Sequence, residues 1–184
     1  MKTGLKEYLT SMVEMVRQMR SKDALDHPYF CVEDFILANG RYFFNISDDE
    51  EFLLNNKGEA KQCFANSQRY LVAGSTNSFM LSDELLYTEG FAIADDVPIP
   101  LYHAWLTRKG TMEVIDLTWK KGIEYFGVIF PTALVLNKVL ERERYAPLVD
   151  DWENDFPFLT GKLKYKCGVD SLNFETAQVL KEVA

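Results

Sequence analysis

The sequence predicts one domain of the α+β class, with helices and an antiparallel sheet in separate stretches of the chain. Three observations favour this class. The chain has 184 residues without an internal repeat or a long linker, so a single domain is expected over 1–184. Apolar side chains recur at helical spacing over residues 5–19, whereas residues 85–119 show the alternation of strands. Helices thus precede and follow consecutive strands, which is typical of α+β folds.

The stretch before the strands is expected to be mainly helical. Helices are predicted where apolar residues repeat every three or four positions, over residues 5–19, 32–38 and 59–72. The second of these is expected to stop at Asn39-Gly40 and the third at Gly74, because glycine favours the end of a helix. Residues 41–46 are expected to be extended, and the acidic residues 47–51 to form a solvated loop or a helix N-terminus.

Strands are predicted from residue 85 onward. Three are expected, over residues 85–94, 101–107 and 112–119, separated by the segments 95–100 and 108–111. Pro131 is expected to open a helix that continues to about Arg144. An acidic loop over 147–157, a strand over 163–167 and a closing helix from about Ser171 are expected to complete the chain.

Composition and charge restrict the classes of partner. The chain is 47% hydrophobic and 26% charged, which is ordinary for a globular protein. No apolar run reaches the roughly 18 residues of a membrane span, and the first residues lack the apolar core of a secretory signal. The net charge is −8, so neither a nucleic-acid partner nor a membrane partner is expected. Three widely spaced cysteines argue against a disulfide framework, and we expect a cytoplasmic location.

Histidine is scarce, which narrows the search for a catalytic base. Of the two histidines, His27 lies in an expected loop, whereas His103 lies on the second predicted strand. A two-residue turn at Lys109-Gly110, or a four-residue loop over 108–111, would place His103 opposite Asp116 on one face of the hairpin. A carboxylate there would hold one imidazole nitrogen and leave the other as a base. A three-residue loop would instead turn Asp116 to the other face.

Cys63 is the cysteine best placed to be a nucleophile. It lies early in the helix expected from Glu59, where unpaired N–H groups and the helix dipole favour a thiolate. If Asn56 caps the helix instead, Cys63 lies nearly two turns into it and this effect fades. The alternative interpretation is a small buried apolar residue, which is the ordinary environment of a free cysteine. Cys31 and Cys167 lack a clear position at a helix start.

Four short segments that include these residues occur in a characteristic order. They are Cys63-Phe64-Ala65-Asn66, Tyr87-Thr88-Glu89-Gly90-Phe91, His103-Ala104-Trp105 and Ile115-Asp116-Leu117-Thr118-Trp119. Together they resemble the core of the transglutaminase-like superfamily, a branch of the papain-like thiol enzymes. The match covers residues 59–119, and Leu117 stands where the family has proline, which leaves the strand free to continue. The resemblance implies a core over about 59–130, in which a helix bearing the cysteine packs on an antiparallel sheet bearing the histidine and the acid, with helical additions at both ends.

The resemblance also implies a reaction. Cys63 would be the nucleophile, His103 the base and Asp116 the residue that orients the base. Such a triad supports acyl transfer, so the expected activity is that of an amide or peptide hydrolase, a deamidase or a transglutaminase-like acyltransferase. The expected substrate is an amide-bearing small molecule or a protein or peptide, with water or an amine as acceptor. No cofactor and no metal ion are expected.

Three further residues are candidates for supporting roles. The oxyanion of an acyl-transfer intermediate needs two donors, of which the backbone N–H of Cys63 is one candidate. The side chain of Gln62 or Asn66 is a candidate for the other. Trp105 shares a strand face with His103 and is expected to shield the imidazole, to line the cleft or to pack in the core.

Two other interpretations compete with catalysis by a thiol. The first is a catalytically silent binding or interaction module on the same fold, in which Cys63 is merely buried. The second is a zinc site with Cys63, His103 and Asp116 as ligands and one open position. The sequence leaves the substrate and the oligomeric state open.

Overall fold

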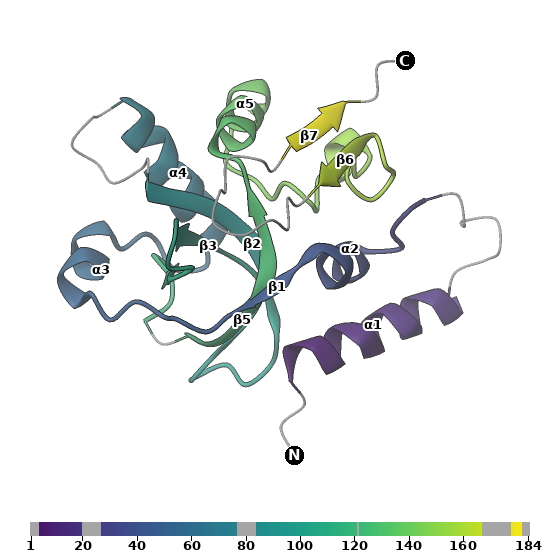
Figure 1. Cartoon of the computed structure of the whole chain (residues 1–184), viewed down its shortest axis with the longest axis horizontal. Coiled ribbons are helices and arrows are strands. Elements are labelled where there is room, and N and C mark those ends of the chain that lie inside the picture. The colour runs from purple at the N-terminus through teal and green to yellow at the C-terminus, as the bar shows by residue number, and fades with distance from the viewer. Residues whose placement is uncertain (1–3, 20–26, 77–83, 121, 167–177, 182–184) are drawn as a thin grey trace.

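The computed structural model describes residues 4–19, 27–76, 84–120, 122–166 and 178–181. Over this part of the chain the fold is α+β, as expected from the sequence. A five-stranded antiparallel sheet is accompanied by α-helices, and a two-stranded sheet lies toward the C-terminus (Figure 1). None of the helices in the described residues has the length and apolar character needed to cross a bilayer.

The helices of the described residues lie close to the predicted ones, apart from a helix over residues 50–56 that the apolar periodicity does not predict. They are α1 (Leu5–Met19), α2 (Val32–Asn39), α3 (Glu50–Asn56), α4 (Cys63–Thr76) and α5 (Thr132–Arg142). The acidic run after residue 46 leads into α3, where the Asp49 carboxylate accepts a hydrogen bond from the Phe52 N–H. Pro131 is the N-cap of α5. The acidic loop over 147–157 contains one short 3-10 helix, η3 (Trp152–Asn154).

The five-stranded sheet closes on itself. Its strands are β1 (Arg41–Phe43), β2 (Leu85–Ala94), β3 (Leu101–Arg108), β4 (Val114–Ile115) and β5 (Gly122–Phe130), in the spatial order β1-β5-β2-β3-β4. Beyond β1, Ile46 forms a bridge with Val114 of β4, and the backbones of Asn45 and Ser47 bond to the same residue. The segment that follows the edge strand β1 is thereby joined to the opposite edge strand, β4. The sheet therefore encloses a small interior.

Apolar side chains pack on both faces of this sheet. Helices α1, α2, α4 and α5 pack on the outer face of the sheet. Each contributes to the larger core, for example through Leu9, Phe35, Leu71 and Val135. The enclosed inner face carries a second core, formed by Phe43, Leu86, Ala92, Trp105, Val114, Tyr125 and Ile129. Burial of apolar surface on both faces is the main favourable contribution to the stability of the sheet.

The hairpin between β3 and β4 has a register that differs from the expected one. Its loop is Lys109–Met112, and Leu106 pairs with Ile115 and Thr107 with Val114. The predicted pairing of His103 with Asp116 is therefore wrong by two residues. Because the shift is even, Asp116 stays on the predicted face of the hairpin.

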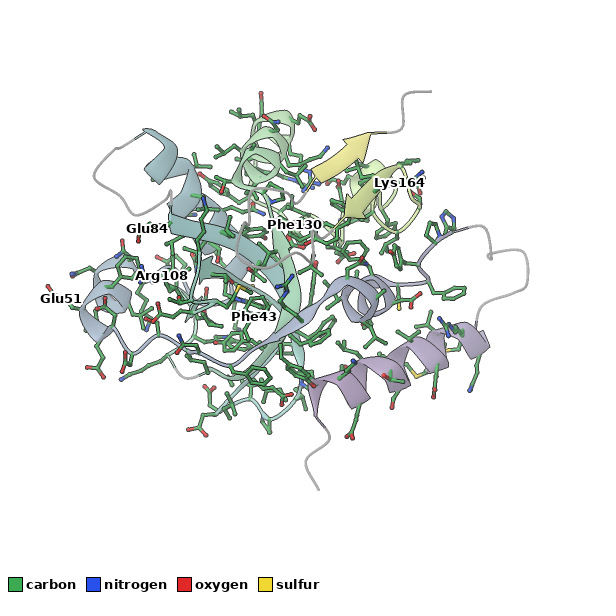
Figure 2. The ribbon with its side chains drawn as sticks, viewed as in Figure 1. Phe43, Glu51, Glu84, Arg108, Phe130 and Lys164 are labelled. Atoms are coloured by element: carbon green, nitrogen blue, oxygen red, sulfur yellow. The ribbon has the colours of Figure 1, made fainter. Side chains whose placement is uncertain are left out.

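Ion pairs anchor the turn end of this hairpin. The Arg108 guanidinium lies 2.6 Å from the Glu113 carboxylate across the loop and 3.5 Å from that of Glu84, which precedes β2 (Figure 2). The Lys109 N–H also donates to the Glu84 carbonyl oxygen. These partly exposed pairs contribute little energy, but they join β2, β3 and the loop at one end of the sheet.

The strand predicted over 112–119 is wrong beyond Ile115, where β4 ends. The Asp116 carboxylate accepts hydrogen bonds from the backbone N–H groups of Thr118 and Trp119, which turns the chain away from the sheet. Leu117 in place of proline therefore does not let the strand continue. Strand β4 thus ends because the Asp116 carboxylate binds the backbone N–H groups that follow it, and not because a proline lacks an N–H group.

Two other elements differ from the prediction. Strand β5 has no counterpart in it, because residues 125–130 are all buried and so lack the alternation that identifies a strand. The closing helix is wrong over Gln178–Lys181, which form β7 and pair antiparallel with β6 (Leu163–Lys166). Residues 171–177 of that expected helix lie outside the described residues.

Candidate active site

Two glycines allow a close approach of strands at the rung that carries His103. Gly90 of β2 pairs with His103 on one side and with Gly127 of β5 on the other. A Cβ atom at Gly90 would lie 2.1 Å from the Phe126 carbonyl oxygen, and one at Gly127 would lie 2.6 Å from Cη2 of Trp105. Neither position accepts a side chain without movement of its surroundings, so this rung depends on glycine.

His103 and Asp116 are brought together at the open end of β3. Strand β4 pairs only with Leu106 and Thr107, so β3 has no strand neighbour on that side at His103. The His103 side chain is buried, and its Nε2 lies 2.7 Å from Oδ2 of Asp116. The contact that the sequence predicts is thus present, although it is diagonal across the hairpin instead of directly cross-strand.

The Asp116 carboxylate is fixed by three further donors. Its Oδ1 accepts from the N–H groups of Thr118 and Trp119, both at 2.9 Å. Its Oδ2, which faces His103, also accepts from the phenol of Tyr125 at 2.8 Å. The carboxylate therefore has one orientation, in which a single oxygen is aimed at the imidazole.

Burial and charge act in opposite directions on this pair. Burial favours neutral imidazole, but the charge and hydrogen bond of Asp116, together with interactions with Cys63, raise the pKa of His103 to about 9. Burial likewise opposes ionisation of Asp116, yet His103 and the two backbone N–H groups hold the pKa of that carboxyl below its ordinary value. At neutral pH the pair is therefore an imidazolium next to a carboxylate.

Cys63 is the first residue of α4. The helix expected from Glu59 begins four residues later, and its first hydrogen bond runs from the Asn66 N–H to the Gln62 carbonyl oxygen at 2.8 Å. The Cys63 N–H consequently belongs to the first turn, whose N–H groups have no partner within the helix. The Cys63 side chain therefore lies at the N-terminal, positive end of the dipole of α4.

The start of α4 is tied to the turn that holds Asp116. The Gly58 N–H donates to the Leu117 carbonyl oxygen at 2.8 Å. The Asn66 side chain donates to the Glu59 carbonyl oxygen at 2.8 Å and to Oγ1 of Thr118 at 2.9 Å, and it accepts from the Glu59 N–H. These bonds fix the position of Cys63 relative to Asp116, although the two residues lie on separate elements.

The thiol of Cys63 lies near the imidazole of His103. Interactions with Cys63 are among the influences that raise the pKa of His103. Asp116 holds Nε2, so Nδ1 is the nitrogen without that partner. The structure therefore places His103 and Asp116 in contact and Cys63 in their neighbourhood, and all three side chains are buried.

Two tryptophans flank the imidazole. Trp119 lies flat on it, with ring centroids 3.9 Å apart and an angle of 11° between the planes. Trp105 is farther away, at 6.4 Å, and is fully buried against Phe43 and Tyr125. Of the roles expected for Trp105, core packing is the one its surroundings match, and Trp119 is the residue that covers the imidazole.

The two candidate oxyanion donors differ in their surroundings. The Asn66 amide is buried and engaged by Glu59 and Thr118, so it anchors a loop. Gln62 is exposed and immediately precedes Cys63, and its side chain has no hydrogen-bond partner among the described residues. Gln62 is therefore the side chain that remains available as a donor.

The described residues contain no group of three or more His, Cys, Asp or Glu side chains arranged to hold a metal ion. The zinc interpretation of Cys63, His103 and Asp116 therefore has no support from their geometry. Oδ2 of Asp116 is instead shared by His103 and Tyr125.

Trp119 and Tyr125 are members of the site that sequence reasoning missed. Trp119 was visible in the Ile-Asp-Leu-Thr-Trp segment, but a turn after Asp116 is needed to bring its ring over His103. Tyr125 lies on β5, which has no alternating pattern, so nothing in the sequence indicated that its phenol faces Asp116.

Comparison of the chain with models of protein families, with curated proteins and with solved structures found no match. The interpretation of the site therefore depends on its own residues and geometry.

Proposed function

We propose that this protein is a thiol-dependent acyl-transfer enzyme with Cys63 as nucleophile, His103 as acid and base, and Asp116 as the residue that orients His103. One observation carries the proposal. A cysteine at the first residue of a helix lies near enough to a buried histidine to influence its pKa, and Nε2 of that histidine lies 2.7 Å from a buried carboxylate.

The protonation state of His103 supports this assignment. A group with a pKa of about 9 is protonated at neutral pH, and an imidazolium beside a thiol stabilises the thiolate. The helix dipole at Cys63 acts in the same direction. We therefore propose that His103 is the proton donor beside the nucleophile Cys63.

The reaction follows from this pair. The Cys63 thiolate attacks the carbonyl carbon of an amide or ester, and the C=O electrons move to oxygen to give a tetrahedral intermediate. When the intermediate collapses, the bond to the leaving amine or alcohol breaks and His103 donates its proton to that group. Water or an amine then attacks the thioester while His103 takes its proton, which releases the acyl product and restores the thiolate.

The intermediate needs donors for its oxyanion. The Cys63 N–H is in place because it has no partner within α4. The Gln62 side chain, which is exposed next to it, is our candidate for the second donor. The substrate class we propose is an amide-bearing small molecule, peptide or protein.

We also propose that residues 59–130 form a transglutaminase-like core. Two features support this proposal. The helix that begins at Cys63 packs on an antiparallel sheet, and the neighbouring strands and turn supply His103 and Asp116. The competing proposal is a catalytically silent module on the same fold, which the burial of Cys63 would also suit.

Selective alkylation tests the thiolate. Native protein is treated with limiting iodoacetamide at about pH 6, where an ordinary thiol is almost fully protonated, and the three cysteines are compared by peptide mass spectrometry. Cys63 should be labelled first. Cys31 is an internal control, because burial and the nearby acidic residues raise the pKa of its thiol to about 11. Equal labelling of the cysteines, or slowest labelling at Cys63, would contradict the proposal.

Acylation separates an enzyme from a silent module. Incubation with p-nitrophenyl acetate should give a burst of nitrophenolate and an acetyl adduct on Cys63, which then turns over. Cys63→Ala and His103→Gln should abolish the burst, whereas the matched variants Cys31→Ala and His27→Gln should retain it. A reactive Cys63 that never forms or releases the acetyl adduct would identify the silent module.

A further inference from the structure

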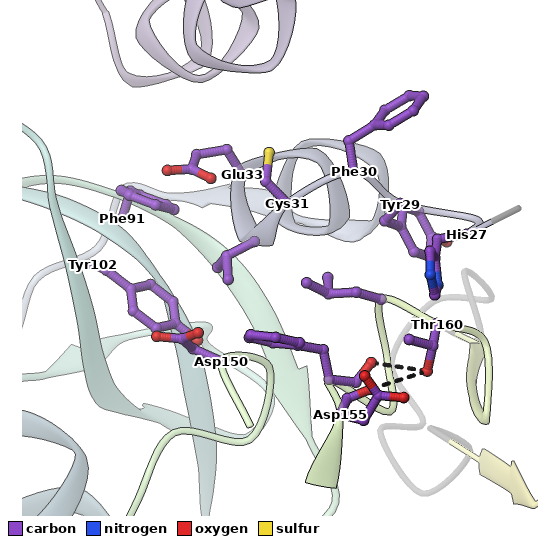
Figure 3. Close-up of a pocket in the computed structure, with 13 residues that line it drawn as sticks. His27, Tyr29, Phe30, Cys31, Glu33, Phe91, Tyr102, Asp150, Asp155 and Thr160 are labelled. Carbon is purple, nitrogen blue, oxygen red and sulfur yellow. Dashed lines mark hydrogen bonds between the residues drawn. The ribbon is translucent and has the colours of Figure 1, made fainter. Parts of the chain in front are cut away.

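A cavity lies apart from the Cys63–His103–Asp116 site. It encloses about 540 Å³ between the N-terminal end of α2, strands β2 and β3, and the segment that follows residue 149 (Figure 3). This volume is within the range of small-molecule sites. Neither Cys63 nor His103 nor Asp116 lines it.

Aromatic rings form much of the wall. Tyr29, Phe91, Tyr102 and Phe156 all line the cavity. The rings of Phe91 and Tyr102 are packed against each other, with centroids 5.4 Å apart, and Tyr29 packs edge-on against Phe35 at 5.1 Å. These rings are held by neighbours, so they offer fixed π-faces to a ligand.

Carboxylates face the same space. Glu33 projects from the first turn of α2, and Asp150 lies across the cavity beside Tyr102 (Figure 3). Within the part of the chain that the structure describes, neither has an ion-pair partner. A third carboxylate, Asp155, is different, because it is exposed at the rim and paired with Lys162 at 2.7 Å. Two partly buried carboxyl groups therefore line one cavity, and among the described residues no lysine or arginine forms an ion pair with either of them.

The two carboxylates repel each other. Burial raises the pKa of Asp150, and the charge of Glu33 raises it further. A cation between the two carboxylates would remove this repulsion.

Hydrogen bonds to a buried carboxylate hold the part of the cavity wall that leads to Asp150. The carboxylate of Glu89, which is fully buried, accepts hydrogen bonds from the Tyr102 phenol at 2.6 Å and from the N–H groups of Leu148 and Val149. Asp150 follows directly in the chain. Tyr102 and the backbone that leads to Asp150 are thus held in place before any ligand arrives, which lowers the entropic cost of binding.

We propose that this cavity is a binding site for an organic ammonium ion, held between the carboxylates of Glu33 and Asp150 and against the surrounding aromatic rings. Ammonium groups bind to π-faces and carboxylates together. An anion would meet the carboxylates of Glu33 and Asp150, and a neutral apolar ligand would leave both desolvated and unpaired. The proposal stands apart from the thiol chemistry, since the reacting residues do not line the cavity.

A matched pair of probes tests the proposal on the full chain. Phenethylammonium and its neutral analogue 2-phenylethanol differ in charge but hardly in shape. Binding is followed by NMR, using the methyl groups of Val32, Leu159 and Thr160, which line the cavity. We expect the ammonium ion to bind about tenfold more tightly than the alcohol, with shifts confined to these methyls. Equal affinity of the two probes, or shifts elsewhere, would overturn the proposal.

Variants assign the preference to the two carboxylates. Glu33→Gln and Asp150→Asn, singly and combined, should each weaken ammonium binding and together remove the preference over the alcohol. Asp155→Asn is the matched control and should keep it, because Lys162 already neutralises Asp155. The double variant loses a repulsion and should fold, which circular dichroism checks, and the single variants give the same test if it does not. A preference that is undiminished in both single variants overturns the assignment.

A last variant separates this proposal from the proposed function. Cys63→Ala should bind phenethylammonium as the wild-type chain does, even though it loses acylation. If Cys63→Ala abolishes ammonium binding, the cavity proposal is wrong, whatever the outcome of the acylation experiment.

Discussion

Trp119 lies parallel to the imidazole of His103, with ring centroids 3.9 Å apart and planes 11° from parallel. The indole covers one face of the imidazole while Asp116 fixes its Nε2. Trp119 itself is partly exposed, so it separates the imidazole from solvent on that side. The contact thus limits how the imidazole can turn and leaves its Nδ1 edge for Cys63.

Replacing Trp119 by alanine tests this restraint. In Trp119→Ala the imidazole is free to rotate, so labelling of Cys63 by limiting iodoacetamide at about pH 6 should slow by roughly tenfold. The His103 ring protons should also lose the upfield NMR shift that a stacked indole causes. Trp119→Phe, which retains a ring, should keep most of both properties. Unchanged ring-proton shifts in the alanine variant would show that the stacking is absent in solution.

The charge of Asp116 is expected to set the pKa of His103. Asp116→Asn removes the charge but keeps the side-chain shape, so the pKa of the imidazole should fall from about 9 by about 1–3 pH units. An NMR titration of the His103 ring protons measures it. Tyr125→Phe is the control, because it removes a hydrogen bond to the carboxylate but keeps the charge. A similar fall in both variants would contradict the role of charge.

Protonation of His103 should make stability depend on pH. The pKa is raised from 6.5 to about 9 on folding, so the stabilisation is complete below pH 6.5 and is lost as the pH rises through about 9. It should amount to something on the order of 3 kcal/mol in the free energy of unfolding. Urea unfolding of the wild type and of His103→Gln at several pH values measures it.

His27→Gln provides the matched comparison for the pH dependence. His27 is exposed, so this variant should lose stability between pH 6.5 and 9 to the same extent as the wild type. His103→Gln should show a flatter profile. Profiles of the same slope in wild type and His103→Gln would place the titrating group elsewhere.

Asn66 is expected to be essential for the position of α4. Asn66→Ala leaves the backbone of Glu59 and the Thr118 hydroxyl without their partners, and it should lower the free energy of unfolding by about 2–3 kcal/mol. Cys63 labelling should slow as well, since the start of α4 is released. Asn55→Ala, on the exposed side of α3, is the control and should change neither quantity. A stable Asn66→Ala with fast labelling would refute the anchoring role.

Local patterns predicted most of the fold. The apolar spacing of residues 5–19 predicted α1, because it reflects one buried face of a helix. Strand β2 was also predicted, although it is buried on both faces, whereas β5, which is buried over residues 125–130, was not. The closure itself depends on the bridge between Ile46 and Val114, a contact of the kind that no local pattern encodes.

The candidate site was predictable only in part. The predicted contact between His103 and Asp116 is present, and Cys63 lies near the imidazole, while the catalytic roles of the three residues stay predictions. The predicted pairing of His103 with Asp116 was wrong by two residues. The two side chains still share a face of the hairpin, because a shift by an even number of residues does not change the face. Asn66, by contrast, was expected near the oxyanion and instead holds Glu59 and Thr118, because tertiary contacts decide which partner an amide finds.

The absence of side chains at Gly90 and Gly127 is a requirement of the site in addition to the three proposed reactive residues. Even a methyl group at either position would push apart the backbones on which the imidazole is mounted. A design that transfers the three proposed reactive side chains to another scaffold would therefore also need glycine at the two corresponding positions. A natural substitution of either glycine by alanine would likewise shift the strand that carries His103, although the glycine itself takes no part in the proposed reaction.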